Sequence, residues 1–102
     1  MIHLGNDLVF TLADLTDAAT GAAVTDAAVS AELRTDAGEP IAGTTVTLAP
    51  VTGGDYRGVL SAADLAGAGV VAGQDVIRRY TATSAGRTGR WDVPDTVALR
   101  TG

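Results

Sequence analysis

Few residues of this chain could carry catalysis, and their spacing does not group them. The only histidine, His3, stands near the start and has no partner at a spacing suited to a metal site or to proton transfer. We expect it to be a frayed terminal residue. Ser30, Ser61 and Ser84 lack both a histidine base and the G-x-S-x-G turn of a serine nucleophile. The sequence therefore predicts that the protein is not an enzyme.

Two further patterns could bind a ligand. The stretch GAGVVAG over Gly67–Gly73 is similar to a nucleotide-binding loop, but its third glycine comes one position too late and a strand pattern follows it. Five aspartates stand in or beside predicted turns, where their oxygens could hold Ca²⁺: Asp14, Asp17, Asp26, Asp36 and Asp55. Aspartate is also the ordinary turn residue, and no D-x-D-x-D-G loop is present. Neither pattern predicts a cofactor or a metal ion, although calcium at the aspartates stays open.

The segment RRYTATSAGRTGRW at residues 78–91 holds four of the seven basic residues. It could be a basic, aromatic surface for a polyanion, or one hairpin of a β-domain. Phosphate contacts dominate nucleic-acid affinity, and a chain with a pI near 4.4 and no lysine is poorly suited to them. In a strand, Arg78 and Arg79 point to opposite faces, so one of them must lie over a partly apolar face. We therefore expect a hairpin with Tyr80 and Trp91 as neighbours, and no nucleic-acid partner.

Charge is divided unevenly along the chain. Residues 1–56 hold one arginine against eight acidic residues, whereas residues 57–102 hold six arginines against four. The arginines could pair with the acidic first half within one chain, or the two halves could form opposite faces for head-to-tail contacts between copies. The candidate interface residues are Arg78, Arg79, Arg87 and Arg90.

Short strands must position these residues. A chain of 102 residues without cysteine can form one domain over 1–102 that needs no disulfide. Apolar and polar residues alternate in runs that glycine- or aspartate-containing turns separate. The predicted strands cover 7–15, 25–35, 43–50, 55–60, 74–84, 90–93 and 95–100. We expect 85–89 to be a hairpin loop and Pro94 to interrupt the last two strands.

The segment 25–35 fits two structures. Val29, Ala31 and Leu33 alternate as in a half-buried strand, but Val29 and Leu33 would also meet on one helix face, with Thr25 or Asp26 as a cap. A strand is favoured because DAGEP follows as a hairpin-type turn. Strand or helix over 26–35 stays open.

The remaining expectations concern the helix and the core. Ser61 as N-cap with Asp64 three residues later predicts one short helical turn near 61–66, which the following glycines end. The expected core anchors are Phe10, Leu12, Leu33, Val46, Leu48, Tyr56, Tyr80 and Trp91. The fold class is all-β, a small antiparallel β-sandwich of about seven strands.

The order of these patterns resembles a known group. The stretches LGNDLVFTLADL, GGDYRGVL and VIRRYTATSAGRTGRW together resemble small immunoglobulin-like or transthyretin-like domains. More narrowly, they resemble immunoglobulin-like accessory domains in the virions of tailed bacteriophages. The chain departs from that group's G-x-Y-x-x-x-L … G-x-x-Y-x-V arrangement, because Ile77 and Arg78 stand where a tyrosine is expected. Periodicity does not reveal strand order, so Greek-key and transthyretin-like topologies both stay open.

The resemblance implies a structural role. We expect a virion protein of the head–tail neck, tail or baseplate that contacts other virion proteins and copies of itself; capsid decoration and a carbohydrate- or ligand-binding module are the alternatives. The start MIHLGNDLVF lacks the basic region of a signal peptide, and no apolar run reaches the ~18 residues that span a bilayer. We therefore expect synthesis in the host cytoplasm, location in the virion, and no membrane partner.

Overall fold

The computed structural model describes residues 2–13, 15–16, 20–84 and 86–99, the side chain of Leu99 excepted. Its elements in chain order are β1 (Ile2–Leu4), β2 (Leu8–Leu12), β3 (Ala28–Thr35), β4 (Val46–Pro50), β5 (Tyr56–Leu60), α1 (Ala62–Gly67), β6 (Asp75–Ser84) and β7 (Arg87–Leu99). The chain is an all-β protein with one short helix, as the alternating pattern predicts. Within the described ranges, no helix is long and apolar enough to cross a membrane.

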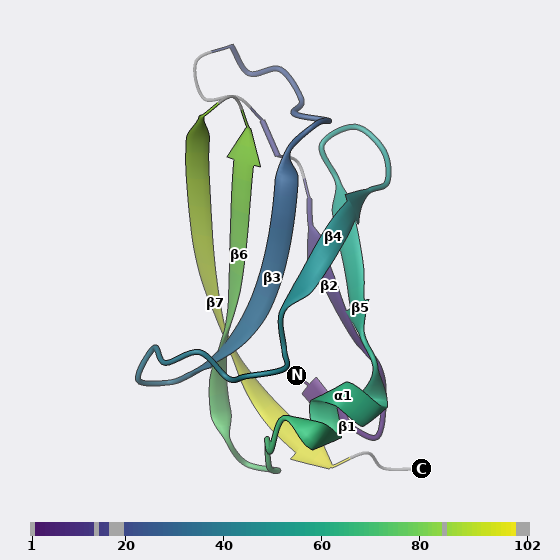
Figure 1. Ribbon diagram of the computed structural model, residues 1–102, viewed down its shortest axis with the longest axis vertical. Helices are drawn as coiled ribbons and strands as arrows, with labels where there is room; N and C mark the ends of the chain where they lie inside the picture. Colours follow the sequence, from purple (N-terminus) through teal and green to yellow (C-terminus); the bar gives the residue numbers. More distant parts are fainter. Residues whose placement is uncertain (1, 14, 17–19, 85, 100–102) are drawn as a thin grey trace.

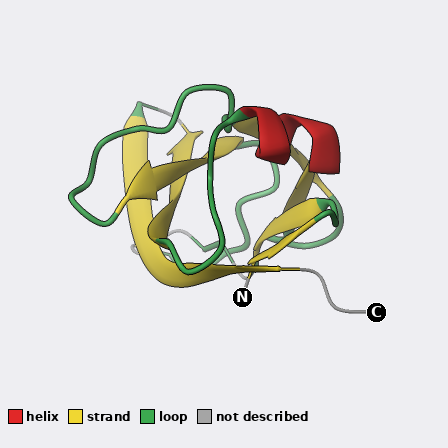
Figure 2. Cartoon of the chain, turned by 90° about the horizontal axis from the view of Figure 1, so that it is seen from below, coloured by secondary structure: helices red, strands yellow, loops and turns green. Residues whose placement is uncertain are grey.

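The strands form two facing layers. Hydrogen bonds join all seven in the order β1-β7-β6-β3-β4-β5-β2, and the sheet bends between β3 and β4 (Figure 1). The rings of Phe10 on β2 and Tyr80 on β6 meet edge to face at 5.9 Å, although their strands stand far apart in that order. The layer β4-β5-β2 therefore packs over the layer β1-β7-β6-β3. Seen from below, α1 lies at one end of the sandwich, to one side (Figure 2).

Part of the strand order matches that of immunoglobulin domains, although here β3 and β4 also pair and join the two layers. With the seven strands lettered A to G in chain order, one layer is D-E-B and the other contains C-F-G, as in immunoglobulin domains. The first strand differs, because β1 pairs in parallel with β7, with Ile2 beside Val97. The sheet is therefore mixed, which corrects the expectation of a wholly antiparallel sandwich.

The ambiguous segment 25–35 contains a strand. Val29, Ala31 and Leu33 of β3 are buried at 2%, 1% and 0% exposure, and the residues between them are more exposed. Strand β3 pairs with β6 along its whole length and with β4 over Val29–Ala31. Two hydrogen-bonded neighbours and one buried face outweigh the helix propensity of these residues.

Both ends of the sequence differ from expectation. His3 is not frayed but lies on β1, next to Ile2, which is 1% exposed. At the other end, β7 runs unbroken from Arg87 through Pro94 to Leu99, so Pro94 does not interrupt it, and 87–89 belong to the strand rather than to a loop. The number of strands matches the prediction, but one was missed and two predicted strands are one.

Pro94 is tolerated because of the direction in which its nitrogen points. The Val97 N–H donates to the Gln74 carbonyl at 2.9 Å, and the Val97 carbonyl accepts from the Gly73 N–H at 2.7 Å, so Val97 bonds toward the β6 side. The backbone N–H and C=O groups of successive residues in a strand point alternately to its two sides. The backbone nitrogen and carbonyl of Pro94, three residues before Val97, therefore point away from β6. β1 covers that side only over residues 97–99. A proline at an uncovered edge position breaks no ladder bond.

The core lies between the layers and is closed by α1. Ser61 accepts a hydrogen bond from the Asp64 N–H at 3.2 Å and caps the helix, and Leu65 from this helix is fully buried. Five expected core residues are buried: Phe10, Leu33, Leu48, Tyr56 and Tyr80. Leu12 and Val46 pack half-buried at its margin. Trp91 does not belong to the core, because it is 40% exposed.

Candidate functional site

The two sides of the sandwich differ. On one side, β3 and β4 pair and close the gap between the layers. On the other side lie β2 and β7, which do not pair with each other in the described part of the chain. We call the gap between β2 and β7 the open side, and it holds the features best suited to binding.

Arg78 bridges the open side near its middle. Its Nε donates to Asp95 Oδ2 at 2.7 Å on β7, and its Nη1 donates to the Val9 carbonyl on β2 at 3.4 Å. Its Cζ lies 5.8 Å from the centre of the Phe10 ring, within cation–π range. The arginine expected over a partly apolar face is therefore Arg78. Its side chain is only 17% exposed, so it joins the two layers rather than presenting a charge to solvent.

Arg79 points to the opposite, outer face. Its Nε and Nη2 donate to the two carboxylate oxygens of Asp92 at 2.8 and 2.9 Å. The hydrogen bond from Arg79 lowers the pKa of Asp92 below its ordinary value. Arg78 and Arg79 thus pair with aspartates of their own hairpin, so for these two arginines the ion pairs lie within the second half of the chain.

Beyond Arg78, the open side contains an apolar groove that we call the Trp91 groove. Its apolar wall consists of Leu15, Val24, Ala27, Ala82 and Trp91, and its polar rim of Thr16, Ser84, Arg87 and Thr88, with Gly89 between them. Trp91 lies against Gly89, where an added Cβ would stand 2.6 Å from the indole. This glycine makes room for the ring on the same face of β7.

The far wall of the groove consists of Leu15, Thr16, Val24 and Ala27, from the described parts of the connection between β2 and β3, and hydrogen bonds hold these parts. The Val24 N–H donates to the Leu15 carbonyl at 2.9 Å. The buried Tyr56 hydroxyl donates to the Val24 carbonyl at 2.6 Å and accepts from the Ala27 N–H at 3.2 Å. These contacts place Leu15, Val24 and Ala27 opposite Trp91, so the groove is preformed.

Trp91 is exposed although it faces the core side of its sheet. It pairs with Tyr80 on β6, and cross-strand partners share a face, yet Tyr80 is 6% exposed and Trp91 40%. Val93, two residues further on the same face, is 46% exposed. Strand β7 is one place further from the centre of the sandwich than β6, and β2, the last strand of the facing layer, ends at Leu12. The inner face of β7 over residues 87–93 is therefore left partly uncovered.

The backbone edge beside this groove is also uncovered. β1 pairs with β7 only at 97–99, so over 87–96 the described chain pairs with β7 on the β6 side alone, and the first part of β7 lies at the upper left border in Figure 1. By the alternation that orients Val97, the N–H and C=O groups of Thr88, Arg90 and Asp92 point outward. The register with β6 is unbroken from Ser84–Arg87 to Asp75–Thr96, so no bulge protects this edge.

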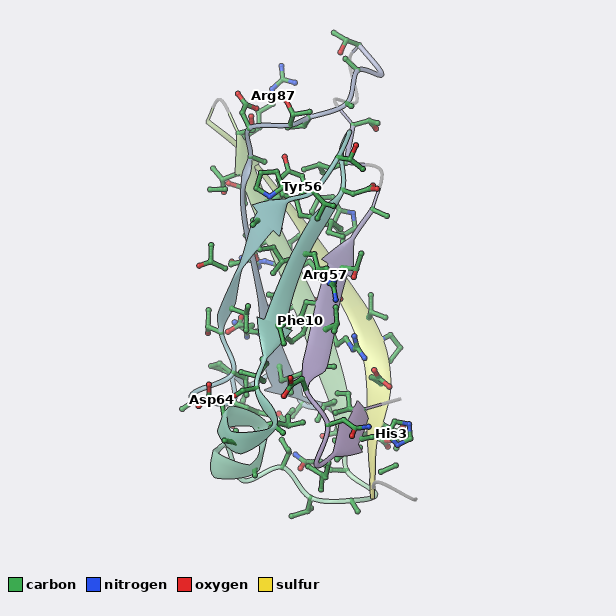
Figure 3. The ribbon with its side chains drawn as sticks, turned by 90° about the vertical axis from the view of Figure 1, so that its right-hand side faces the viewer. His3, Phe10, Tyr56, Arg57, Asp64 and Arg87 are labelled. Carbon is green, nitrogen blue, oxygen red and sulfur yellow. The ribbon has the colours of Figure 1, made fainter. Side chains whose placement is uncertain are left out.

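The four candidate arginines do not form one patch. Arg78 and Arg79 are engaged in ion pairs on opposite faces, Arg87 lies on the groove rim, and Arg90 is exposed on the outer face of β7. His3 is exposed at the end of the molecule opposite Arg87 (Figure 3).

The described residues contain no group of three or more His, Cys, Asp or Glu that could hold a metal ion. Of the aspartates considered for calcium, Asp14 and Asp17 lie outside the described residues. Asp26 accepts a hydrogen bond from the Ser84 hydroxyl at 3.4 Å.

The sequence did not reveal the exposure of Trp91 and Val93. The available signal was Pro94, because a proline inside a strand pattern marks an uncovered edge. In comparisons with protein-family models, curated proteins and solved structures, none matched this chain.

Proposed function

We propose that this protein is a non-enzymatic immunoglobulin-like module that acts through protein–protein contacts at its open side. The observation that carries the proposal is the exposure of Trp91 and Val93 on the core-facing side of β7, beside an uncovered strand edge. Large aromatic side chains are enriched at the centres of interfaces, and uncovered strand edges bind other strands. A preformed apolar groove supports the same role, because little order is lost when a partner enters it.

The proposed setting is the virion of a tailed bacteriophage, in the head–tail neck, tail or baseplate, with capsid decoration as an alternative position. This part of the proposal rests on the resemblance of LGNDLVFTLADL, GGDYRGVL and VIRRYTATSAGRTGRW to virion accessory domains. An immunoglobulin-like strand order agrees with that resemblance.

Mass spectrometry of purified virions tests both parts. We expect the chain in virions, and we expect W91E to lower its incorporation. V59E is the matched control, because Val59 is 48% exposed on β5, away from the groove. Absence of the chain from virions would overturn the setting, and equal incorporation of wild type and W91E would overturn the open side as the contact. Terminase, portal or tail-tube genes beside this gene would support the setting independently.

The exposed indole favours a second candidate, a carbohydrate-binding module. Sugars stack on exposed aromatic rings, and the rim of the Trp91 groove supplies hydroxyls from Thr16, Ser84 and Thr88. Trp91 is the only tryptophan, so titration with glycans can be followed by its fluorescence. A saturable change that W91F weakens would favour this candidate over a protein partner.

A further inference from the structure

We infer that the uncovered edge of β7 pairs with the same edge of a second copy, antiparallel, with Trp91 of each copy opposite Trp91 of the other. The inference rests on the proposed contact role of the open side and names its occupant. Three observations lead to it: the outward backbone groups of β7, the order of charges around Trp91, and the exposed apolar face at 89–93.

The backbone supplies the first argument. Thr88, Arg90 and Asp92 present N–H and C=O groups outward in an unbroken strand. In a two-fold antiparallel pair centred on Trp91, Arg90 of one copy and Asp92 of the other form a hydrogen-bonded pair, and this occurs twice. Thr88 then faces Pro94, which lacks an N–H but can still accept through its carbonyl. Pro94 therefore marks the end of the pairing.

The charges select this register. Residues that lie directly opposite each other in a strand pair must point to the same face of the sheet. The two-fold axis of the pair can therefore pass beside Trp91 or beside another residue of β7, but not midway between two residues. A centre at Arg90 or Asp92 places two like charges directly opposite each other, which destabilises a strand pair. A centre at Gly89 or Val93 separates Arg90 from Asp92. Only the centre at Trp91 places Arg90 of each copy beside Asp92 of the other on the outer face, where Asp92 keeps its bonds to Arg79 and its side chain is still 41% exposed.

The apolar face supplies the third argument. Positions equally distant from Trp91 face each other, so Gly89 lies opposite Val93 of the second copy. Trp91 leans against its own Gly89, and each indole is thereby brought next to Val93 of the other copy. Pairing would cover the two side chains that are 40% and 46% exposed. The self-complementary order Arg90–Trp91–Asp92 makes a second copy a better fit than an unrelated extended peptide.

The oligomeric state of the whole chain is the first test. Sedimentation equilibrium from about micromolar to millimolar concentration should show a monomer–dimer equilibrium. W91E should lower the association constant of the dimer by about tenfold or more. V59E, with its charge placed on the other layer, should associate like wild type. A wild type that stays monomeric, or a W91E variant that associates as well as wild type, would overturn the inference. Circular dichroism checks that each variant is folded.

Charge reversal tests the register. R90D places two carboxylates opposite each other across the pair, and D92R places two guanidinium groups opposite each other, so each variant alone should associate less than wild type. A mixture of R90D and D92R restores both opposite-charge pairs, and we expect it to form the heterodimer. A mixture that associates no better than the separate variants would overturn the Trp91-centred register.

A cysteine at the two-fold centre tests it directly. The chain has no cysteine, so W91C carries a single thiol. Opposite residues of a non-hydrogen-bonded pair have Cα atoms ~4.5 Å apart, within the range a disulfide spans. W91C should therefore form a disulfide-linked dimer on mild oxidation much faster than V59C, and equal rates would contradict the inference. A monomeric wild type together with loss of W91E from virions would overturn the second copy as occupant and leave the proposed contact role standing with another partner.

Discussion

The closed and open sides of the sandwich join the same two layers by different means. On the closed side, backbone hydrogen bonds between β3 and β4 carry the sheet from one layer to the other, and Val29 and Leu48 pair within it. On the open side, the link is the side chain of Arg78, which reaches from β6 to Asp95 and to the β2 backbone. A continuous ladder leaves no gap, whereas one side chain closes only the part of the gap that it spans.

The difference explains where apolar surface remains exposed. Beside the closed side and Arg78, the inner residues Leu33 and Phe10 are fully buried. Val93, which pairs with Arg78, and Trp91, which lies past it, face inward but stay exposed, because β7 lies one strand further out than β6 and the facing layer ends at β2. The open side therefore combines a structural bridge with a binding surface, and variants can separate the two roles.

The largest effect is expected from removing the ring beneath Arg78. Phe10 is 0% exposed and contacts both Tyr80 and the Arg78 guanidinium. F10A should lower the free energy of unfolding by about 3–5 kcal/mol, the usual cost of a large core cavity. Urea unfolding measures this, with T11A on the exposed face of the same strand as the control. A loss below about 1 kcal/mol would contradict the described packing.

A buried hydroxyl on the closed side gives the next effect. The Thr44 Oγ1 accepts from the Leu33 N–H at 3.0 Å and donates to the Ile41 carbonyl at 2.7 Å. T44V keeps the volume but leaves both backbone groups without this partner, so we expect a loss of about 2 kcal/mol. The neighbouring Thr45 is exposed, and T45V should leave urea unfolding nearly unchanged. Equal effects of the two variants would show that the Thr44 hydroxyl does not support this side.

Substitution of Arg78, which bridges the open side, should lower the free energy of unfolding somewhat less than T44V does. R78Q removes the ion pair between Arg78 and Asp95 and the contact with the Val9 carbonyl. Because the pair is partly exposed, we expect a loss of about 1–2 kcal/mol, below that of a fully buried charge pair. Amide hydrogen exchange should accelerate on β2 more than on β4. Equal acceleration on both strands would contradict the bridging role.

The smallest effect concerns the exposed outer face and depends on pH. The hydrogen bond from Arg79 lowers the pKa of Asp92 below its ordinary value of 3.8. A carboxyl with a lowered pKa in the folded state stabilises the fold above that ordinary value, and the stabilisation is lost as the pH falls through the folded-state pKa.

The comparison of wild type with R79Q measures this contribution. In dilute solution, wild type should be slightly more stable than R79Q at pH 7, and the difference should shrink as the pH falls below the ordinary pKa of Asp92 and vanish once the carboxyl is protonated in the folded state as well. A difference that persists at low pH would mean that Arg79 stabilises the fold through packing rather than through its ion pair.

Much of the local structure could be predicted because it depends on neighbours in the sequence. Alternation at Leu8 and Phe10 predicts β2, and Ser61 followed by Asp64 predicts the capped turn of α1. The division of Arg78 and Arg79 between two faces follows from strand geometry alone. The missed features depend on other parts of the chain: β1 is too short to show alternation, and it is held by β7 from the opposite end of the sequence.

The sequence by itself determined the strand-rich character of this protein, the inner and outer faces of each strand, and the charges on either side of Trp91. Only the tertiary structure decided which inner faces are covered. Periodicity states the direction in which a side chain points, but burial also requires a second layer opposite it. Phe10 and Trp91 both point inward, and one is buried while the other is exposed, because the facing layer ends before it reaches Trp91. The open side, and the groove within it, follow from that ending.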